Sequence, residues 1–249
     1  MKADIVYGIH AVGSLLKNRR EDILELYVLQ GRHDKRLHNL LQRSKGIQQT
    51  LKNRNALNEI ADSEQHQGIV ALVNSTAESK ANLLPESELE NYLSGLASAP
   101  LILILDGVTD PHNFGACLRS ADAAGVDLVI TPKDKSVGLT PVVRKVACGA
   151  AEEIALCQVT NLARTMELLK ANNVWIYGAA GEAESSIYEL EYTGGCAIVM
   201  GAEGPGMRRL TKEKCDYLFN IPMQGSVSSL NVSVATGICL FEAVRQRKR

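Results

Sequence analysis

The chain has 249 residues, of which 45% are apolar and 22% are charged, and its formal net charge is −1. This balance excludes a disordered or fibrous protein, and the length is enough for one large or two modest domains with a buried core. The apolar runs are far shorter than the roughly 20 residues that cross a bilayer, and the first residues carry no apolar signal segment. We therefore expect a cytoplasmic protein with no membrane partner.

The six cysteines form no C-x-x-C pair and lie mostly inside apolar stretches. This spacing fits neither a zinc site nor a disulfide framework. The sequence therefore predicts reduced, buried thiols and no metal centre.

Residues 1–75 predict a small α/β domain, with strand-like runs at 23–29 and 68–73 and helical periodicity at 9–16 and 35–44. Between Lys17 and Arg54 there are ten basic and four acidic residues. Such a basic segment is compatible with RNA binding. On charge alone, however, the solvated surface of a small domain is the simpler explanation.

Residues 76–98 are polar and acidic and predict a linker with one short helix near 86–93. From 99 to 249 the pattern alternates between strands and helices, which predicts a doubly wound α/β domain with a mostly parallel sheet. The expected strands are 101–105, 128–130, 154–156, 174–177, 197–200 and 217–221, and the expected helices are 114–124, 141–148, 162–172, 205–214 and 230–245. Ligands of such sheets bind beyond the carboxyl ends of the strands.

Two loops that follow predicted strands combine glycines with polar side chains. The first, DGVTDPHNFGACLRSADAAG (106–125), places Asn113 where a helix N-cap would lie and Arg119 about two turns into the helix. The second, VMGAEGPGM, surrounds Glu203 with glycines that would let backbone amides approach a ligand. It is neither a Walker loop nor a GxGxxG motif. Taken singly, each loop also fits a capped helix or a tight turn.

A third loop, IPMQGSVSSLNVSVATGICLFEA (221–243), leads from a strand into an otherwise apolar helix. Polar side chains such as Ser229 and Asn231 need hydrogen-bond partners at a buried helix start. Plain capping residues would explain them equally well.

Together, the order and spacing of the three loops resemble the three motifs of the SPOUT methyltransferases, in particular the TrmH-like branch that methylates ribose 2′-hydroxyls in RNA. The matching patterns are N-x-G-x-x-x-R at 113–119, G-x-E-x-x-G at 201–206 and an unbroken run over 221–235. Upstream, YGIHAV (7–12) and HQGIVALV (66–73) resemble the small RNA-binding domain of the bacterial enzymes that methylate a guanosine of 23S ribosomal RNA. His10 and His66 in these motifs are either packed histidines or RNA contacts.

The resemblance implies a knotted catalytic domain over 99–249, with a deep trefoil knot, behind an RNA-binding domain over 1–75. It implies S-adenosylmethionine as the methyl donor, no metal, and a homodimer formed through the knotted domain. The implied reaction is 2′-O-methylation of a guanosine ribose in 23S ribosomal RNA or its precursor. Carried over position by position, the cofactor contacts include Gly201, Ile221 and Leu230.

A ribose hydroxyl is a poor nucleophile unless its proton is shared and the oxygen lies in line with the methyl group. The candidate catalytic residues are Asn113, Arg119, Glu203, Ser229 and Asn231. Since a guanidinium stays protonated, we expect Arg119 to clamp the adjacent phosphate and the developing oxyanion charge, with Glu203 orienting Arg119 or the ribose. The two asparagines would hold the loop and the nucleotide, and Ser229 would complete the polar wall.

Three alternatives stay open or are disfavoured at this point. A methyltransferase acting on tRNA or on another ribosomal RNA site shares the catalytic motifs, although the N-terminal domain argues against the tRNA enzymes that lack it. A non-catalytic RNA-binding or assembly factor would bind S-adenosylmethionine without methyl transfer, which the intact motif residues disfavour. A nucleotide-dependent dehydrogenase lacks its glycine fingerprint here.

Overall fold

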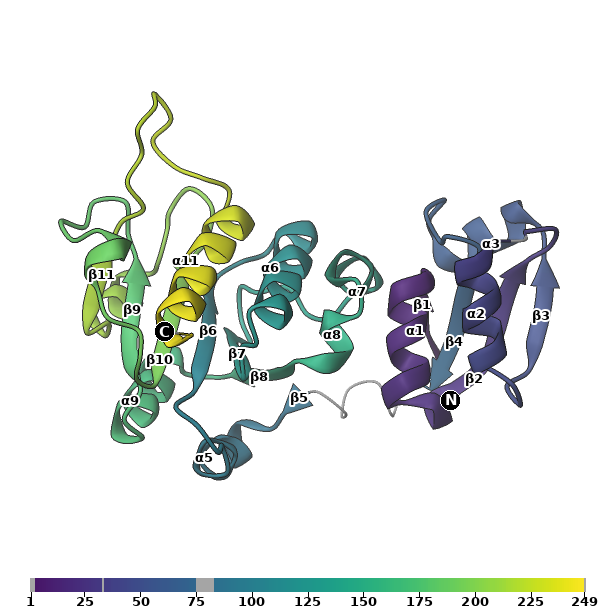
Figure 1. Ribbon diagram of the computed structural model, residues 1–249, viewed down its shortest axis with the longest axis horizontal. Helices are drawn as coiled ribbons and strands as arrows, with labels where there is room; N and C mark the ends of the chain where they lie inside the picture. Colours follow the sequence, from purple (N-terminus) through teal and green to yellow (C-terminus); the bar gives the residue numbers. More distant parts are fainter. Residues whose placement is uncertain (1–2, 33, 75–82, 249) are drawn as a thin grey trace. The chain divides into compact units, whose positions relative to one another are not determined.

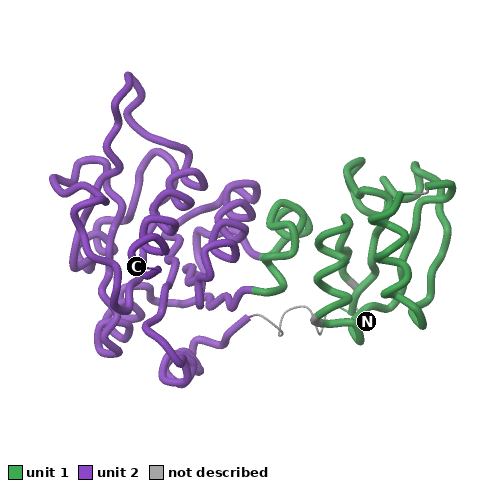
Figure 2. The backbone as a smooth tube through the Cα atoms, in the orientation of Figure 1, with its two compact units in different colours: residues 1–82, 139–153 green, residues 83–138, 154–249 purple. Residues whose placement is uncertain are grey.

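The computed structural model describes residues 3–32, 34–74 and 83–248. Residues 76–82 of the expected linker lie outside these ranges. Backbone contacts divide the chain into two compact units, one of Met1–Asn82 with Leu139–Glu153 and one of Leu83–Gly138 with Ile154–Arg249 (Figure 2). Within the described ranges, no helix combines the length and hydropathy needed to cross a membrane.

The first unit is built on a four-stranded sheet in the order β1-β4-β2-β3 (Figure 1). These strands are β1 (Ala3–Tyr7), β2 (Ile23–Leu29), β3 (Gln49–Lys52) and β4 (Ile69–Asn74). Strand β4 is antiparallel to β1 and β2, and β2 is parallel to β3. The sequence predicts β2 and β4 but not the other two, because β3 is polar and lies at an edge, where alternation with a buried face is weak.

Helices cover both faces of this sheet. Successive strand residues point to opposite faces: Val6 packs in the cluster that includes α1 (Ile9–Asn18) and α2 (Lys35–Arg43). Its neighbour Tyr7 packs with α3 (Arg54–Ala61) on the other face. The unit is therefore a three-layer α/β/α domain, with a short 3₁₀ turn at Arg20–Asp22 after α1.

Two short helices from the middle of the chain, α7 (Pro141–Ala147) and α8 (Ala150–Glu153), belong to this first unit and contact α1. A buried ion pair between Arg144 and Glu152 holds them together. Burial raises the pKa of the Glu152 carboxyl, although Arg144 and Arg19 oppose the rise. The sequence predicts these residues as part of the domain at 99–249, since contacts with α1 leave no pattern in the local sequence.

The second unit contains a seven-stranded parallel sheet in the order β11-β9-β10-β6-β7-β8-β5. All six expected strands are present, as β6 (Leu101–Asp106), β7 (Leu128–Pro132), β8 (Ala155–Val159), β9 (Trp175–Ala179), β10 (Cys196–Gly201) and β11 (Tyr217–Phe219). The seventh strand, β5 (Leu83–Leu84), comes from the expected linker and has only two residues, too few to show a period.

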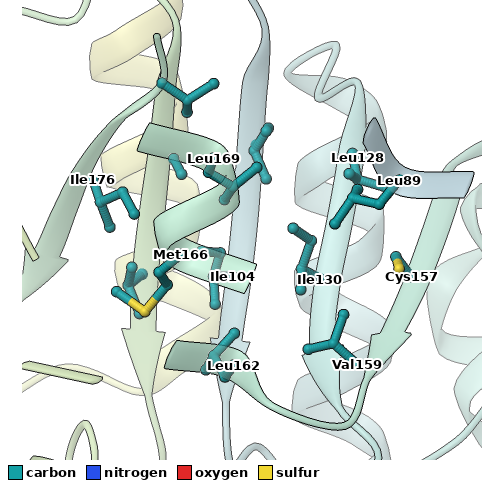
Figure 3. Close-up of a cluster of buried hydrophobic side chains, with 14 of the residues drawn as sticks. Leu89, Ile104, Leu128, Ile130, Cys157, Val159, Leu162, Met166, Leu169 and Ile176 are labelled. Carbon is teal, nitrogen blue, oxygen red and sulfur yellow. The ribbon is translucent and has the colours of Figure 1, made fainter. Parts of the chain in front are cut away.

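The helices of this unit are α5 (Leu89–Ser94), α6 (Pro111–Ala123), α9 (Leu162–Ala171), α10 (Arg209–Glu213) and α11 (Val232–Arg247), with 3₁₀ turns at Glu86–Glu88 and Ile187–Glu189. One face of the sheet forms an apolar core with α5 and α9, in which Leu89, Ile104 and Met166 are fully buried (Figure 3). Helix α11 packs against β10 and α6. The short helix expected in the linker is thus confirmed, and it belongs to this core.

The strand LILIL is buried along its whole length, as a central parallel strand covered on both faces should be. The fold class predicted from the sequence is confirmed in its α/β architecture and its parallel sheet. The trefoil knot that the resemblance implies stays a prediction.

Candidate active site

The candidate site lies at the carboxyl ends of the central strands, where the chain order of the sheet reverses. From β6 the chain runs to β7 and β8 on one side, and β10, β9 and β11 occupy the other. Such a switch point opens a crevice in a parallel sheet. A cavity of about 950 Å³ lies here, lined by the loops that follow β9, β10 and β11.

Three polar side chains from three separate loops form a closed hydrogen-bonded triangle. Asn113 Nδ2 donates to Glu203 Oε1 over 2.8 Å, and Asn231 Nδ2 donates to the same oxygen over 2.8 Å. Asn231 Nδ2 also donates to Asn113 Oδ1 over 2.9 Å. The structure therefore brings together three of the five residues that the sequence proposes for catalysis, and we call this arrangement the Asn–Glu–Asn triangle.

The start of α6 differs from the expected one and explains how Asn113 becomes free to reach Glu203. The helix begins at Pro111, and Asp110 is its N-cap, accepting the Asn113 backbone N–H over 2.7 Å. The expectation that Asn113 caps the helix is therefore wrong. Because Asp110 satisfies the helix end, the Asn113 side chain is available to the second and third loops.

Asn231, by contrast, has two functions at once. Its Oδ1 caps α11 by accepting the backbone N–H of Ser233 over 2.9 Å, while its Nδ2 completes the Asn–Glu–Asn triangle. A single amide thus fixes the start of the last helix relative to the loop that carries Glu203. This double use explains an asparagine at a position that the sequence analysis could equally assign to simple capping.

Gly201 lines the cavity, as expected. The reason that a glycine stands here, however, is the backbone of its own loop and not the access of a ligand. A Cβ at this position would overlap the backbone of Gly206 and Met207. The glycine is therefore required by the loop itself, which folds back so that Ala202 and Gly206 exchange backbone hydrogen bonds of 3.1 and 3.0 Å. A larger residue at 201 would disrupt this loop before it obstructed any ligand.

A buried carboxylate that the sequence analysis missed anchors the far end of the same loop. Asp106, at the end of β6, is 1% exposed and accepts hydrogen bonds from the Arg208 backbone N–H (2.9 Å) and Nε (2.6 Å). In the sheet register it lies beside Gly201. An acid that ends a wholly apolar strand needs a partner when buried, and this is the signal that could have identified it.

The other two proposed catalytic residues lie apart from the Asn–Glu–Asn triangle. Ser229 is exposed and lines the cavity, together with the proposed cofactor residues Ile221 and Leu230. Arg119 is exposed on α6 and pairs with no acid among the described residues. Glu203 therefore does not orient Arg119 in this structure, which leaves the ribose as its expected partner.

The sequence analysis also missed the loop after β9, which forms one wall of the cavity with Ala179, Ala180, Gly181 and Glu182. Glu182 forms an ion pair with Lys212, which lines the same cavity. The strand order explains this wall, because β9 lies beside β10 and its carboxyl end opens at the same edge. Nothing in the local sequence of the loop signals it.

The cysteine on α6, the helix that also carries Asn113, is unsuited to nucleophilic chemistry. Cys117, on α6, is fully buried, and its thiol lies 3.4 Å from the Thr236 hydroxyl on α11. Burial is the main reason that the pKa of Cys117 is raised to about 11, so the thiol stays protonated near neutral pH. Among the residues that the structure describes, no cluster of His, Cys, Asp and Glu side chains is arranged to hold a metal ion.

The cavity fits a ligand that is recognised mainly through backbone groups. Between Ile221 and Leu230, no backbone N–H or C=O pairs with another backbone group of the described chain. These groups are therefore available to a ligand at the cavity edge. Met200, Phe219 and Ala235 add an apolar wall, and Asn231 adds a polar one. An adenosyl group needs this combination of an apolar slot and unpaired backbone donors and acceptors.

Comparison with known proteins gives consistent matches over the whole chain. A model of the SpoU rRNA Methylase family matches residues 100–241, and a model for RNA 2'-O ribose methyltransferase substrate binding matches residues 5–78. The chain is 59% identical over 249 residues to the 23S rRNA (guanosine-2'-O-)-methyltransferase RlmB of Shewanella oneidensis, covering 99% of each. It is 56% identical over 247 residues to the protein of that name from Escherichia coli K12, covering 98% of this chain and 99% of the relative.

Solved structures share the same architecture. A crystal structure of an RNA 2'-O ribose methyltransferase matches with a TM-score of 0.83 and 25% identity, covering 99% of this chain and 90% of that chain. The SpoU methyltransferase AviRb of Streptomyces viridochromogenes, solved in complex with the cofactor AdoMet, shares the fold with a TM-score of 0.78 and 22% identity, covering 99% of this chain and 91% of that chain.

The Asn–Glu–Asn triangle generates a pH-dependent prediction. The substitution Asn231→Asp keeps the acceptor that caps α11 but replaces the donor to Glu203 with a second carboxylate. Like charges this close repel by a few kcal/mol even at an effective dielectric constant of about 20. We expect binding of S-adenosylmethionine, the cofactor implied by the sequence, to weaken about tenfold at pH 8, as measured by calorimetric titration and normalised to wild type at each pH.

The deficit should shrink as the pH falls, because a proton shared between the two carboxylates restores a donor. Asn231→Ala is the control for charge, since it removes the Asn231 hydrogen bonds of the triangle and the α11 cap without adding a carboxylate, and its deficit should not change with pH. Equal, pH-independent affinities for Asn231→Asp and wild type would contradict a role for the triangle in shaping the cavity.

Proposed function

The chain belongs to the SpoU rRNA methylase family, and from this premise we propose that it methylates the 2′-hydroxyl of a guanosine ribose in 23S ribosomal RNA. The observation that carries the proposal is the Asn–Glu–Asn triangle, which joins the three motif loops beside a cavity of about 950 Å³. Relatives at 56–59% identity over nearly their full length carry this activity in their names. The substrate-binding match over residues 5–78 supports an RNA substrate.

The proposed methyl donor is S-adenosylmethionine, which supplies a methyl group on a sulfonium when bound. The unpaired backbone of 221–223 and 228–230 and the loop that starts at Gly201 would hold it, since both line the cavity. The apolar wall would take its adenine. No metal is required for this transfer, because the sulfonium itself activates the methyl group.

Glu203 is the proposed acceptor for the hydroxyl proton of the ribose. Its Oε1 is occupied by the two asparagine amides, while its Oε2 has no partner among the described residues. The amides fix the carboxylate in one orientation, so that Oε2 can accept a hydrogen bond from the ribose 2′-hydroxyl. When bound, S-adenosylmethionine would supply the methyl carbon to the ribose oxygen and be left as the neutral thioether, while Glu203 would accept the hydroxyl proton.

Arg119 has a different proposed function, on the RNA side of the reaction. It is exposed in the third turn of α6, with no acid to neutralise it among the described residues. A free guanidinium fork is suited to a phosphate oxygen pair next to the reacting ribose. Ser229, exposed at the cavity edge, would add a polar contact to the nucleotide.

We place this reaction in the cytoplasm, where ribosomal RNA is made and modified in bacteria.

The test is methyl transfer from labelled S-adenosylmethionine to unmodified 23S ribosomal RNA, with position mapping of the ribose methyl group and with tRNA as the competing substrate. We expect one guanosine of 23S RNA to be methylated and tRNA to remain unlabelled. Methylation of tRNA alone would support the tRNA alternative. Cofactor binding with no transfer to any RNA would support the assembly-factor alternative.

Variants of Arg119 test its proposed function in the same assay. Arg119→Ala should lower the single-turnover rate on the order of 100–1000-fold, since it removes a donor to charge that develops in the transition state. Cofactor affinity should be unchanged, and Arg119→Lys should recover only part of the rate. A rate for Arg119→Ala within a few-fold of wild type would remove Arg119 from the catalytic machinery.

A homodimer through the last helix is a further part of this proposal. Val234 and Phe241 on α11 are 52% and 49% exposed, and Ile238 lies between them at helical spacing. These residues form an outward apolar stripe on a helix whose opposite side is already buried against α6 and β10. Exposed apolar side chains on the second face of a packed helix favour a partner that covers them.

The substitution Phe241→Glu tests this stripe by placing a charge at its C-terminal end. We expect the protein to become monomeric in sedimentation velocity, with its helical content retained. Leu210→Glu is the control, because Leu210 is 51% exposed on α10, outside the stripe, and should leave the dimer intact. A wild-type protein that sediments as a monomer, or a Phe241→Glu variant that still dimerises, would contradict the proposal.

A further inference from the structure

The two N-terminal motifs meet in space and build one corner of the first unit. The Gly8 backbone N–H donates to the Ile69 carbonyl over 3.1 Å, and the Ile9 N–H donates to Gln67 Oε1 over 3.0 Å. Strand β1, which ends at Tyr7 where the YGIHAV motif begins, pairs along its length with β4, which begins directly after His66–Gly68. The turn at His66–Gly68 is therefore held in place by the residues that link β1 to α1.

His66 fixes this turn from inside and is not itself a free ligand group. Its side chain is 2% exposed, its Nδ1 accepts the Gly68 backbone N–H over 3.0 Å, and its Nε2 lies 3.0 Å from Asn58 Oδ1. An imidazole with one accepting and one donating nitrogen is neutral. Of the two interpretations left open by the sequence, the structure thus favours the packed histidine.

Gly68 leaves room for an arginine to lie across the turn. Its φ is +77°, and a Cβ at this position would come within 2.8 Å of Arg32 Cδ. The Arg32 side chain therefore packs directly against the Gly68 backbone, and its Nε lies 2.5 Å from Asp34 Oδ2. The glycine of the HQG motif thus permits both the left-handed backbone and the close approach of a cationic side chain.

Arg32 borders a second cavity of about 520 Å³ within this unit, which we call the HQG pocket. The other charged residues that line it are Arg54, Lys145 and one acid, Glu64. Arg54 is exposed and pairs with no acid among the described residues. Lys145 donates to Gln65 Oε1 over 2.5 Å and lies 5.7 Å from the centre of the Tyr7 ring, and no acid of the described chain forms an ion pair with it.

The positive charges of the HQG pocket are not balanced by its acids. Burial lowers the pKa of the Lys145 ammonium. The pKa of His66 is lowered first by burial and then by the charges of Arg54 and Arg32. Arg54 also lies at the first position of α3, where the helix dipole disfavours a cation. An arrangement of this kind becomes favourable when an anion enters, because Arg54 and Lys145 then gain the acidic partner that Arg32 already has in Asp34.

We propose that the HQG pocket binds a phosphate of the RNA substrate's backbone, with Arg54 and Lys145 as its principal contacts and Arg32 as the third cation. This inference rests on the proposed function, since it takes RNA as the substrate. The size of the pocket suits one nucleotide unit, and phosphate contacts position an RNA chain without reading its sequence. Arg32 and Arg54 also belong to the basic segment between Lys17 and Arg54, which favours a polyanion over a free metabolite as the ligand.

The test compares the full-length Arg54→Gln, Lys145→Gln double variant with wild type in RNA binding at several salt concentrations. We expect RNA affinity to fall about tenfold and the slope of log affinity against log salt to lose about 0.7 for each phosphate contact removed. Methyl transfer should show a raised KM for RNA and a kcat within two-fold of wild type, with S-adenosylmethionine affinity unchanged. Failure of the proposed function itself would be separate, because wild type would then transfer no methyl group.

The matched control is Lys35→Gln, Arg36→Gln, which removes the same charge from exposed positions of α2 outside the pocket. An equal loss of affinity in this control would overturn the proposal in favour of a diffuse positive surface. If the double variant is less stable than wild type, Arg54→Gln alone is used, since Arg54 is exposed, and Lys145→Arg should retain binding.

His66 provides an independent reporter by nuclear magnetic resonance. A bound phosphate offsets the charges of Arg54 and Arg32, so RNA binding should raise the pKa of His66 toward its usual value. Inorganic phosphate and a mononucleotide serve as comparison ligands and should shift it only at much higher concentration. A mononucleotide that binds as tightly as RNA, or RNA that leaves the His66 titration unchanged, would overturn the assignment.

Discussion

One carboxylate oxygen joins the three loops of the second unit that form the candidate site. Glu203 Oε1 accepts amide hydrogen bonds from Asn113, 90 residues before it, and from Asn231, 28 residues after it. Three loops from different strands are thereby joined, and those that carry Glu203 and Asn231 line the cavity. The parallel sheet brings the loops to one edge, but a sheet alone does not set them to the fraction of an ångström that transfer chemistry needs. The hydrogen bonds of the Asn–Glu–Asn triangle supply this final positioning.

The rest of the site depends on groups that keep these loops in shape. Asp106 is buried at the end of β6 and holds Arg208, while the absence of a side chain at Gly201 lets the same loop fold back on itself. The first unit uses comparable means for a different purpose, since a buried His66 and a bare Gly68 shape the HQG pocket. In both units a rigid turn, built from backbone and buried polar groups, presents side chains to a ligand.

Much of this organisation could be predicted from the sequence, for reasons that particular residues make clear. Continuous apolar strands such as Leu101–Asp106 and their flanking loops mark a parallel sheet, and the three motifs mark the family, which the comparisons confirm. Contacts distant in sequence could not be predicted in the same way. The two-residue strand β5, the anchoring of Arg208 by Asp106 and the wall after β9 depend on which strands become neighbours. The N-cap of α6 is Asp110 and not the predicted Asn113, because Asp followed by Pro is itself a strong helix start.

The most direct test of the account is a double-mutant cycle on Asn113→Ala and Asn231→Ala, read out as single-turnover methyl transfer to RNA. The loss of the α11 cap occurs in both arms that carry the change at Asn231 and therefore cancels. Because both amides orient one carboxylate, the account predicts that the two effects are not additive, with a coupling free energy of about 1 kcal/mol or more. Strictly additive effects would show that the two asparagines act independently and that the triangle does not organise the site.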